Sequence, residues 1–223
     1  MHSIQTGNAA FDRSFGMSMY EYLTQNSEAN SSFNLWMKET TKEWIVPVLK
    51  TYDFSKVRNL VDVGGCSGFQ TAMILQKHPQ LQAILFDREE VVSEANQEMS
   101  EEGVASRCQV RCGDFFDSVP PGGDLYLISR VLLNWDDERA LQILNNCRYA
   151  MTNSAKLLIM NFILPNKGVS RGHLLSSINL LVLGGKTMRT ESEYYQMLEK
   201  AGFQSPKLIK TKGMIDYIEA VLV

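Results

Sequence analysis

Cysteine, basic charge and long apolar runs are all scarce in this chain of 223 residues. Its four cysteines form no Cys-x-x-Cys pair and have no metal-like spacing with the three histidines, so we expect free thiols and no metal site. No stretch approaches the ~20 apolar residues of a membrane span, and the first ten residues lack the apolar core of a signal peptide. We therefore expect a cytoplasmic protein that does not bind membranes.

The balance of charge argues against a nucleic acid as the main partner. The 25 Asp and Glu residues outnumber the 22 Lys and Arg residues, and both signs are scattered along the chain. A phosphate backbone needs a basic face, which this composition does not supply. With 44% apolar residues, the chain has an ordinary globular composition and is long enough for one α/β core.

The spacing of the apolar residues changes near residue 59. Before it, apolar side chains recur at helical intervals over 8–50, which predicts an N-terminal helical unit within 1–55. After it, short apolar stretches alternate with amphipathic ones, so 56–223 is expected to form a doubly wound α/β domain with a mostly parallel sheet. The expected strands are 59–63, 83–87, 109–113, 124–131, 157–164, 207–212 and 216–222, the last two forming an antiparallel hairpin. The expected helices of this part are 68–77, 91–100, 136–151, 174–183 and 191–201.

Residues 60–68, LVDVGGCSG, form the clearest motif, in which an expected strand runs into a glycine turn and then a helix. Glycine lets the backbone approach a ligand closely, and the helix N-terminus presents free N–H groups. The functional interpretation is a nucleotide-type ligand at the carboxyl end of the first strand. Taken alone, the motif is explained equally well as a structural turn.

Two acidic residues strengthen the ligand interpretation because each ends one of the next two expected strands. Asp87 is placed to accept both hydroxyls of a ribose. Asp114 is placed to accept from an adenine amino group, with Phe115 against the ring. Each acid alone would be an ordinary solvated loop residue. At the ends of three successive strands, the acids and the glycine turn predict a cleft for an adenosine.

The residues just before the glycine turn favour S-adenosylmethionine over a nicotinamide dinucleotide. Val63 occupies the first glycine position of the G-x-G-x-x-G pattern that holds a pyrophosphate. Asp62 argues against a phosphate and suits the sulfonium and ammonium groups of S-adenosylmethionine. We therefore expect S-adenosylmethionine as the cofactor and S-adenosylhomocysteine as its product.

Further stretches carry a resemblance that covers essentially the whole chain. They are FGMSMYEYL at 15–23, GDFFDSVP at 113–120, DLYLISRVLLNWDDE at 124–138, and GGKTMRT at 184–190 followed by Glu193 and AGF at 201–203. In this order they resemble the small-molecule O-methyltransferases of plants, fungi and bacteria. The resemblance implies the class I methyltransferase (Rossmann-like) fold. It also implies methyl transfer from S-adenosylmethionine to a hydroxyl of an aromatic or polyketide-like small molecule.

The resemblance also implies roles for individual residues. The donor would be held by Gly64, Asp87, Asp114, Phe115 and Ser129, with Trp135 nearby. The acceptor pocket would be lined by Phe11, Phe15, Met17, Phe33, Met37, Leu133 and Leu183. The candidate catalytic residues are Asn134 and Asn179, as hydrogen-bonding groups for the acceptor, and the acid Glu193. Ordinary helix packing would explain each apolar pocket residue taken singly.

One departure from the family pattern concerns the general base. Leu133 stands where plant-type members have a histidine, and a leucine cannot take a proton. Asn161 stands where a glutamate usually orients that base, so only Glu193 keeps its acidic type. The Leu-Leu-Asn-Trp form resembles a bacterial polyketide-tailoring branch, the anthracycline O-methyltransferases and a relative that hydroxylates. We expect methyl transfer by positioning, while hydroxylation or decarboxylation, or donor binding without catalysis, stay open as alternatives.

A second departure concerns the domain organisation. Family members usually carry an N-terminal winged-helix domain that makes the dimer, whereas this sequence opens almost at the helices that precede the core. The expected partners are therefore a small-molecule acceptor together with either a second copy of the chain or a separately supplied N-terminal domain.

Overall fold

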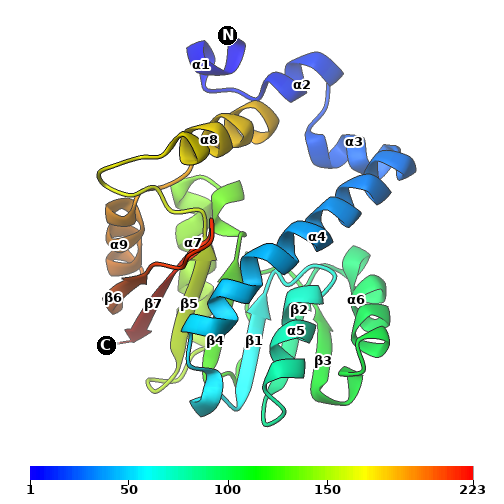
Figure 1. Cartoon of the computed structure of the whole chain (residues 1–223), viewed down its shortest axis with the longest axis vertical. Coiled ribbons are helices and arrows are strands. Elements are labelled where there is room, and N and C mark those ends of the chain that lie inside the picture. Colours follow the sequence, from blue (N-terminus) through cyan, green and yellow to red (C-terminus); the bar gives the residue numbers. More distant parts are fainter. Residues whose placement is uncertain (223) are drawn as a thin grey trace.

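The computed structural model describes residues 1–222, which form a seven-stranded sheet with helices on both faces (Figure 1). The strands are β1 (Asn59–Val63), β2 (Gln82–Asp87), β3 (Cys108–Cys112), β4 (Leu125–Ser129), β5 (Lys156–Asn161), β6 (Phe203–Ile209) and β7 (Asp216–Leu222). Their order is β3-β2-β1-β4-β5-β7-β6, with β1 to β5 parallel and β7 antiparallel to both of its neighbours. The predicted mostly parallel sheet with a C-terminal antiparallel hairpin is confirmed.

The helices divide between the two faces because successive strand residues point to opposite sides. The helices are α1 (His2–Thr6), α2 (Ala10–Phe15), α3 (Met19–Gln25), α4 (Ser27–Thr51), α5 (Phe69–Lys77), α6 (Glu89–Glu101), α7 (Asp137–Ala150), α8 (Arg171–Gly184) and α9 (Glu191–Lys200), with 3-10 turns η1 (Phe54–Lys56), η2 (Ala105–Arg107) and η3 (Leu132–Asn134). In β4, Leu125 and Leu127 pack in a core with α4, α5 and α6. Tyr126 and Ile128 pack in the opposite core with α7 and α9. Both faces are therefore covered, as a central parallel strand requires.

Four strand ends differ from the prediction by two residues or more: β5 ends at Asn161 rather than at 164, β6 ends at Ile209 rather than at 212, and two others have a local reason in the backbone. β4 ends at Ser129 rather than at 131 because Arg130 has a φ of 57°, in the left-handed region, and turns the chain out of the sheet. β6 begins at Phe203 rather than at 207. An irregularity in its pairing, where Ser205 has a φ of 50°, lets the strand accommodate Pro206. Left-handed conformations at residues other than glycine explain why the sequence pattern misplaced the end of β4 and the start of β6.

The N-terminal helices and α8 lie over the end of the sheet to which the parallel strands point (Figure 1). There α2 packs against α8, and α3 against α4. Capping boxes at Ser18 and Ser170 define the starts of α3 and α8. No residue of α8 is fully buried, and Leu174, Leu175 and Ile178 are about half exposed. Helix α8, the N-terminal helices α1 to α3 and the first half of α4 are called the helical cap below. The cap therefore exposes apolar side chains of α8 to solvent.

Three further properties hold for the described part of the chain. None of its helices is both long and apolar enough to cross a membrane. Within residues 1–222, no group of three or more His, Cys, Asp or Glu side chains is arranged to hold a metal ion. All four cysteines are free thiols.

Candidate functional site

The glycine turn between β1 and α5 lies directly against the segments that follow β3 and β4. Its backbone takes a positive φ at Gly64 (75°) and at Cys66 (53°). The Gly64 N–H donates to the carbonyl of Phe86 at 2.8 Å, which ties the turn to β2. A Cβ at Gly64 would lie 2.6 Å from Cγ2 of Val131 and 3.5 Å from Cε1 of Phe115. Only glycine fits at this crossing of segments.

Asp87 holds the glycine turn from the end of β2. Its Oδ2 accepts the N–H of Cys66 at 2.8 Å, and its Oδ1 accepts the N–H of Arg88 at 2.8 Å. Each oxygen keeps a lone pair for a further donor. Asp87 thus lies where a ligand in the turn would meet it, and its binding of a ribose stays a prediction.

The loop after β3 brings two predicted donor residues together with Trp135. Oδ1 of Asp114 accepts the N–H of Phe116 at 2.7 Å, so the exposed Asp114 also braces its own loop. The ring centre of Phe115 lies 6.2 Å from that of Trp135, and Phe116 lies 4.7 Å from Trp135. Because Phe115 also lies against Gly64, this aromatic group forms one wall beside the glycine turn.

Asp62 is buried beneath the glycine turn, with 1% of its surface exposed. The hydroxyl of Thr71 in α5 donates to its Oδ2, whereas Oδ1 has no partner among the residues that the structure describes. Burial raises the pKa of Asp62 to about 6, and the hydrogen bond from Thr71 opposes that rise. An unpartnered carboxylate oxygen under the turn makes the local potential negative at neutral pH, which favours a cationic ligand.

Two polar side chains stand at the end of β4. Oγ of Ser129 donates to Oε1 of Gln70 at 2.8 Å, which joins β4 to α5. Nη2 of Arg130 donates to Oγ1 of Thr41 at 2.8 Å, and the guanidinium carbon lies 4.7 Å from the ring centre of Trp44. Nη1 of Arg130 is buried and has no partner within the described residues. Burial lowers the pKa of Arg130 to about 10, so the side chain is cationic at neutral pH.

The sequence prediction missed Arg130, although a signal for it is present. It is the only charged residue in the apolar run 125–133, LYLISRVLL. A charged side chain in a stretch that is expected to be buried is uncommon, and such groups are frequently part of a site. The signal was therefore the position of the arginine within the run.

The turn η3 carries Leu133 and Asn134 at the position of the missing base. Leu133 is 7% exposed, and Nδ2 of Asn134 donates to the carbonyl of Arg130 at 3.2 Å. Asn161, at the position of the orienting acid, is fully buried. Its Nδ2 donates to the hydroxyl of Tyr194 at 2.6 Å, and its Oδ1 accepts the next backbone N–H at 2.9 Å. Asn161 is thus committed to contacts inside the fold.

The predicted acceptor residues fall into two groups in the helical cap. Phe11 and Phe15 of α2 stack with ring centres 4.4 Å apart, and Tyr22 lies 5.6 Å and 4.9 Å from them. Phe33 of α4 lies 5.9 Å from Trp36 in a separate aromatic group. Of the other predicted residues, Met17, Met37 and Leu183 are half-buried, and Asn179 is exposed on α8. Their joint role as one pocket stays a prediction.

Glu193 lies in the first turn of α9, where it caps the helix. Its Oε2 accepts the N–H of Thr190 at 2.6 Å and the Thr190 hydroxyl at 2.8 Å. The N–H of Glu193 donates back to Oγ1 of Thr190 at 3.3 Å, which completes a capping box. The cap accounts for an acid at this position, and a catalytic role for Glu193 stays a prediction.

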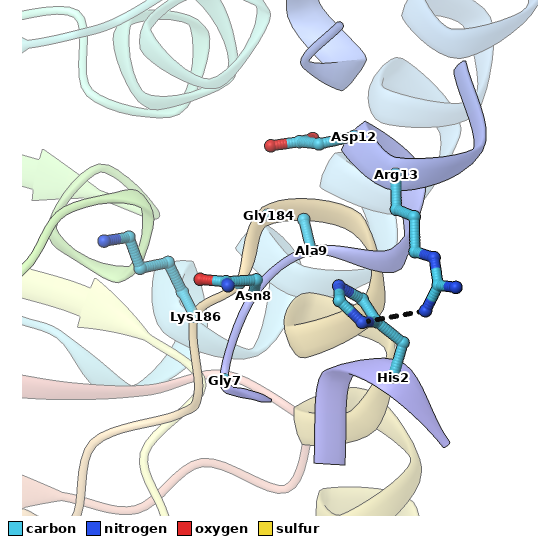
Figure 2. A pocket seen from close by; sticks show the side chains of 9 residues that line it. His2, Gly7, Asn8, Ala9, Asp12, Arg13, Gly184 and Lys186 are labelled. Carbon is cyan, nitrogen blue, oxygen red and sulfur yellow. Dashed lines mark hydrogen bonds between the residues drawn. The ribbon is translucent and has the colours of Figure 1, made fainter. Parts of the chain in front are cut away.

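A separate surface hollow lies between the N-terminal segment and the loop after α8 (Figure 2). It is lined by His2, Gly7, Asn8, Ala9, Asp12, Arg13, Gly184, Gly185 and Lys186. Figure 2 shows His2 and Arg13 directed toward each other, with 3.2 Å between Nδ1 of His2 and Nη1 of Arg13. None of the predicted site residues lines this hollow, so it is distinct from the predicted donor site at the strand ends.

The fold and these residues define an α/β protein with polar side chains gathered around a glycine turn at the carboxyl edge of a parallel sheet. Next to β1 the chain turns to β2 on one side and to β4 on the other, which is the switch point where such folds bind ligands. The O-methyltransferase domain family matches residues 2–204, and the chain belongs to this family.

Characterised relatives and solved structures agree with this assignment. The chain is 36% identical to the phenazine O-methyltransferase of Lysobacter antibioticus, over 99% of this chain and 64% of that protein. It is 35% identical to the O-demethylpuromycin-O-methyltransferase of Streptomyces alboniger, over 100% of this chain and 61% of that protein. The mitomycin 7-O-methyltransferase structure superposes with a TM-score of 0.93 at 33% identity, over 100% of this chain and 66% of that one. The chain therefore spans less than two thirds of the two characterised relatives.

Proposed function

We propose that this chain binds S-adenosylmethionine and transfers its methyl group to a hydroxyl of an aromatic or polyketide-like small molecule. The observation that carries the proposal is the group of polar side chains at the switch point, where Asp62, Asp87 and Arg130 lie around the glycine turn and Asp62 and Arg130 keep unpartnered atoms. The names of related enzymes support the acceptor class, because they include a phenazine and an aminohydroxybenzoate methyltransferase. A related O-methyltransferase was crystallised with S-adenosylmethionine and a hydroxynaphthoic acid.

The residues of the cleft fit the charges of S-adenosylmethionine. The unpartnered Oδ1 of Asp62 favours the cationic end of the ligand, and the unpartnered Nη1 of Arg130 suits its carboxylate. Asp87 would accept the ribose hydroxyls, and Asp114 the adenine amino group beside Phe115. Ser129 and Trp135 would complete this donor site. Oδ1 of Asp62 and Nη1 of Arg130 would each gain a partner that the described protein residues do not provide.

The chain's own contribution to the reaction would be alignment. Bound S-adenosylmethionine supplies an activated methyl group and leaves as S-adenosylhomocysteine. Asn134 and Asn179 would orient the acceptor hydroxyl, and Leu133 would form an apolar wall where a base is absent. Near-attack alignment can lower a reaction barrier by ~7–11 kcal/mol. This exceeds the contribution of a general base, which typically accelerates a reaction ~10²–10⁴-fold. The proton of the acceptor would pass to water, so acidic phenols are the favoured substrates.

The test is incubation with S-adenosylmethionine carrying an isotopically labelled methyl group and a panel of phenols, followed by product mass. A labelled methyl gain in the product supports the proposal. Leu133 at the base position is the observation that favours the alternatives. A product that has gained oxygen would indicate hydroxylation, and one that has lost carbon dioxide would indicate decarboxylation. Donor binding with no product on any phenol would indicate a non-catalytic domain.

We also propose an arrangement of domains and partners. The helices of 1–55 would form one side of the acceptor pocket, and 56–223 the donor-binding part. A second copy of the chain would cover the apolar face of α8, where Leu174, Leu175 and Ile178 are 53%, 57% and 48% exposed. Sedimentation velocity distinguishes the outcomes, since a dimer supports the second copy. A monomer that shifts only when an N-terminal domain is added would indicate that domain instead.

A further inference from the structure

We infer that Arg189 is a positioning residue that holds η3 in the geometry required for methyl transfer. The inference rests on the proposed function, because the turn that Arg189 holds carries Leu133 and Asn134, the residues proposed to meet the acceptor. Nothing in the sequence prediction singled out Arg189 within the GGKTMRT stretch.

The guanidinium of Arg189 donates hydrogen bonds to both ends of the turn. Nη1 donates to the carbonyl of Leu132 at 2.6 Å, and Nη2 donates to the carbonyl of Trp135 at 2.6 Å. Leu133 and Asn134 are the two residues between these carbonyls. The planar guanidinium presents its donors in a fixed fork, so two carbonyls bound by one fork have their separation set by it.

The backbone of Arg189 is itself anchored to the segment that follows β5. Its carbonyl accepts the N–H of Leu164 at 2.9 Å, and the N–H of Glu191 donates to the Leu164 carbonyl at 3.2 Å. Thr190, the next residue, begins α9 within the capping box that Glu193 completes. The acid at 193 therefore stabilises the segment from which Arg189 reaches η3.

A buried network extends the anchor to the end of β5. The side chain of Arg189 lies beside Tyr194, whose hydroxyl accepts from Asn161 at 2.6 Å. Burial raises the pKa of Tyr194 to about 12, so its hydroxyl stays protonated at neutral pH. The network links the position of the missing orienting acid to the turn at the position of the missing base. In this chain these positions therefore hold a fixed network of hydrogen bonds, whereas an enzyme with a general base would have to transfer a proton there.

The surface ion pair of Arg189 contributes less than its two carbonyl bonds. Nε of Arg189 donates to Oδ1 of Asp137 at 2.9 Å, but the Asp137 side chain is 86% exposed and that of Arg189 is 11% exposed. Exposed ion pairs are weak because water screens them. Removal of the guanidinium would instead take the donor from the Trp135 carbonyl, leave the Leu132 carbonyl with only the N–H of Trp135 at 3.4 Å, and free η3 to shift.

The chain offers a matched control for the loss of an arginine that binds two carbonyls. Arg107, at the opposite end of the strands, donates through Nη1 to the carbonyls of His78 and Leu81 at 3.3 Å and 3.2 Å. The variants Arg189→Met, Arg189→Lys and Arg107→Met are compared for kcat, KM, donor affinity and melting temperature. All kinetic assays are run well below the lowest melting temperature.

Arg189→Met is expected to lower kcat about 10–10²-fold, since a small misplacement near the reacting atoms has an effect of this size. KM and donor affinity should change by less than about threefold, because the donor half is held separately. Arg189→Lys should recover part of kcat, and Arg107→Met should leave kcat unchanged. A kcat of Arg189→Met equal to that of Arg107→Met would overturn the inference.

Hydrogen exchange makes the test independent of turnover. Amides of residues 131–136 should exchange about tenfold faster in Arg189→Met than in the parent chain, at an intermediate rate in Arg189→Lys, and at the parent rate in Arg107→Met. Unchanged exchange there overturns the positioning role even if the parent chain methylates nothing. Absence of methylation by the parent chain, with faster exchange in the Arg189 variants, counts against the proposed function alone.

Discussion

The donor half and the acceptor half of the proposed site are built in different ways. In the donor half, the glycine turn, Asp87 and Arg130 are tied by hydrogen bonds to residues of the sheet and of α4. In the acceptor half, α8 buries no residue fully, and Phe15 of α2 is 49% exposed. The first half has a rigid frame within residues 1–222, whereas the second depends on what covers the helical cap.

This difference predicts that changes in the two halves have different consequences. A side chain that braces the glycine turn acts on ligand affinity and on stability together, because it lies in a packed region. A side chain on the exposed cap acts on acceptor turnover with little effect on folding, because few contacts depend on it. Four variants, one of them studied as a function of pH, test this contrast.

The largest effect is expected for Asp87→Ala. Loss of the carboxylate removes the acceptor for the Cys66 N–H and both proposed ribose bonds. Hydrogen bonds to charged groups contribute about 1.5–3 kcal/mol each, so donor affinity should fall about 10²–10³-fold in titration calorimetry. Asp117→Ala, at an exposed acid in the loop after β3, is the control and should bind normally. Retained affinity in Asp87→Ala would place the ligand elsewhere.

Gly64→Ala should have the next largest effect. It should lower stability, which is measured as the free energy of unfolding in urea. Gly64 combines a φ of 75° with a contact of 2.6 Å between an added Cβ and Val131. Gly103 has a φ of 70° and nothing within 4 Å, so Gly103→Ala shows the backbone strain alone. Gly64→Ala should lose roughly 1–3 kcal/mol more than this control. Val131→Ala in the Gly64→Ala background should restore part of the loss. Equal losses at the two glycines would contradict the close crossing of segments.

Asp62→Asn should change stability and donor binding in opposite directions. The pKa of Asp62 rises from 3.8 to about 6 on folding, so the folded chain binds more protons between these values. Stability of the donor-free chain should therefore fall, by up to about 3 kcal/mol, as pH rises from 4 to 6, and should be level above that. Asp62→Asn removes this dependence and stabilises the chain at pH 7.5.

Donor binding by the parent chain should strengthen as pH rises through 6, since the ionised carboxylate attracts the cationic ligand. Asp62→Asn should weaken donor binding about tenfold at pH 7.5, equivalent to about 1.4 kcal/mol. Calorimetry at pH 5.5 and 7.5 measures both effects. Donor affinity that does not respond to pH in the parent chain would show that Asp62 does not act on the ligand.

The smallest effect on folding is expected in the acceptor half. Asn179→Ala, at an exposed position of α8, should change the free energy of unfolding by less than about 0.5 kcal/mol. It should lower kcat/KM for a phenolic acceptor about 3–10-fold, the effect of one hydrogen bond. Donor affinity should be unchanged. An equal loss of donor affinity would mean that the two halves are not separable.

The same contrast explains what could be predicted from the sequence. The alternation of strands and helices, the glycine turn and the acids Asp87 and Asp114 are local patterns, and they predicted the fold and the placement of these residues at the strand ends. Arg189 acts on Leu132, which is distant in sequence, so no local pattern marks it. The acid Glu193 was marked by its type alone, and its contacts show a helix cap. Helical spacing identified the aromatic residues of the cap, but it cannot show which of their faces another surface covers.

Titration calorimetry of the folded chain with S-adenosylmethionine and with S-adenosylhomocysteine tests the donor site most directly. The cleft of Asp62, Asp87 and Arg130 predicts saturable 1:1 binding of both ligands and its loss in Asp87→Ala. Absence of binding of either ligand to the folded parent chain, or equal binding by Asp87→Ala, would contradict the assignment of this cleft.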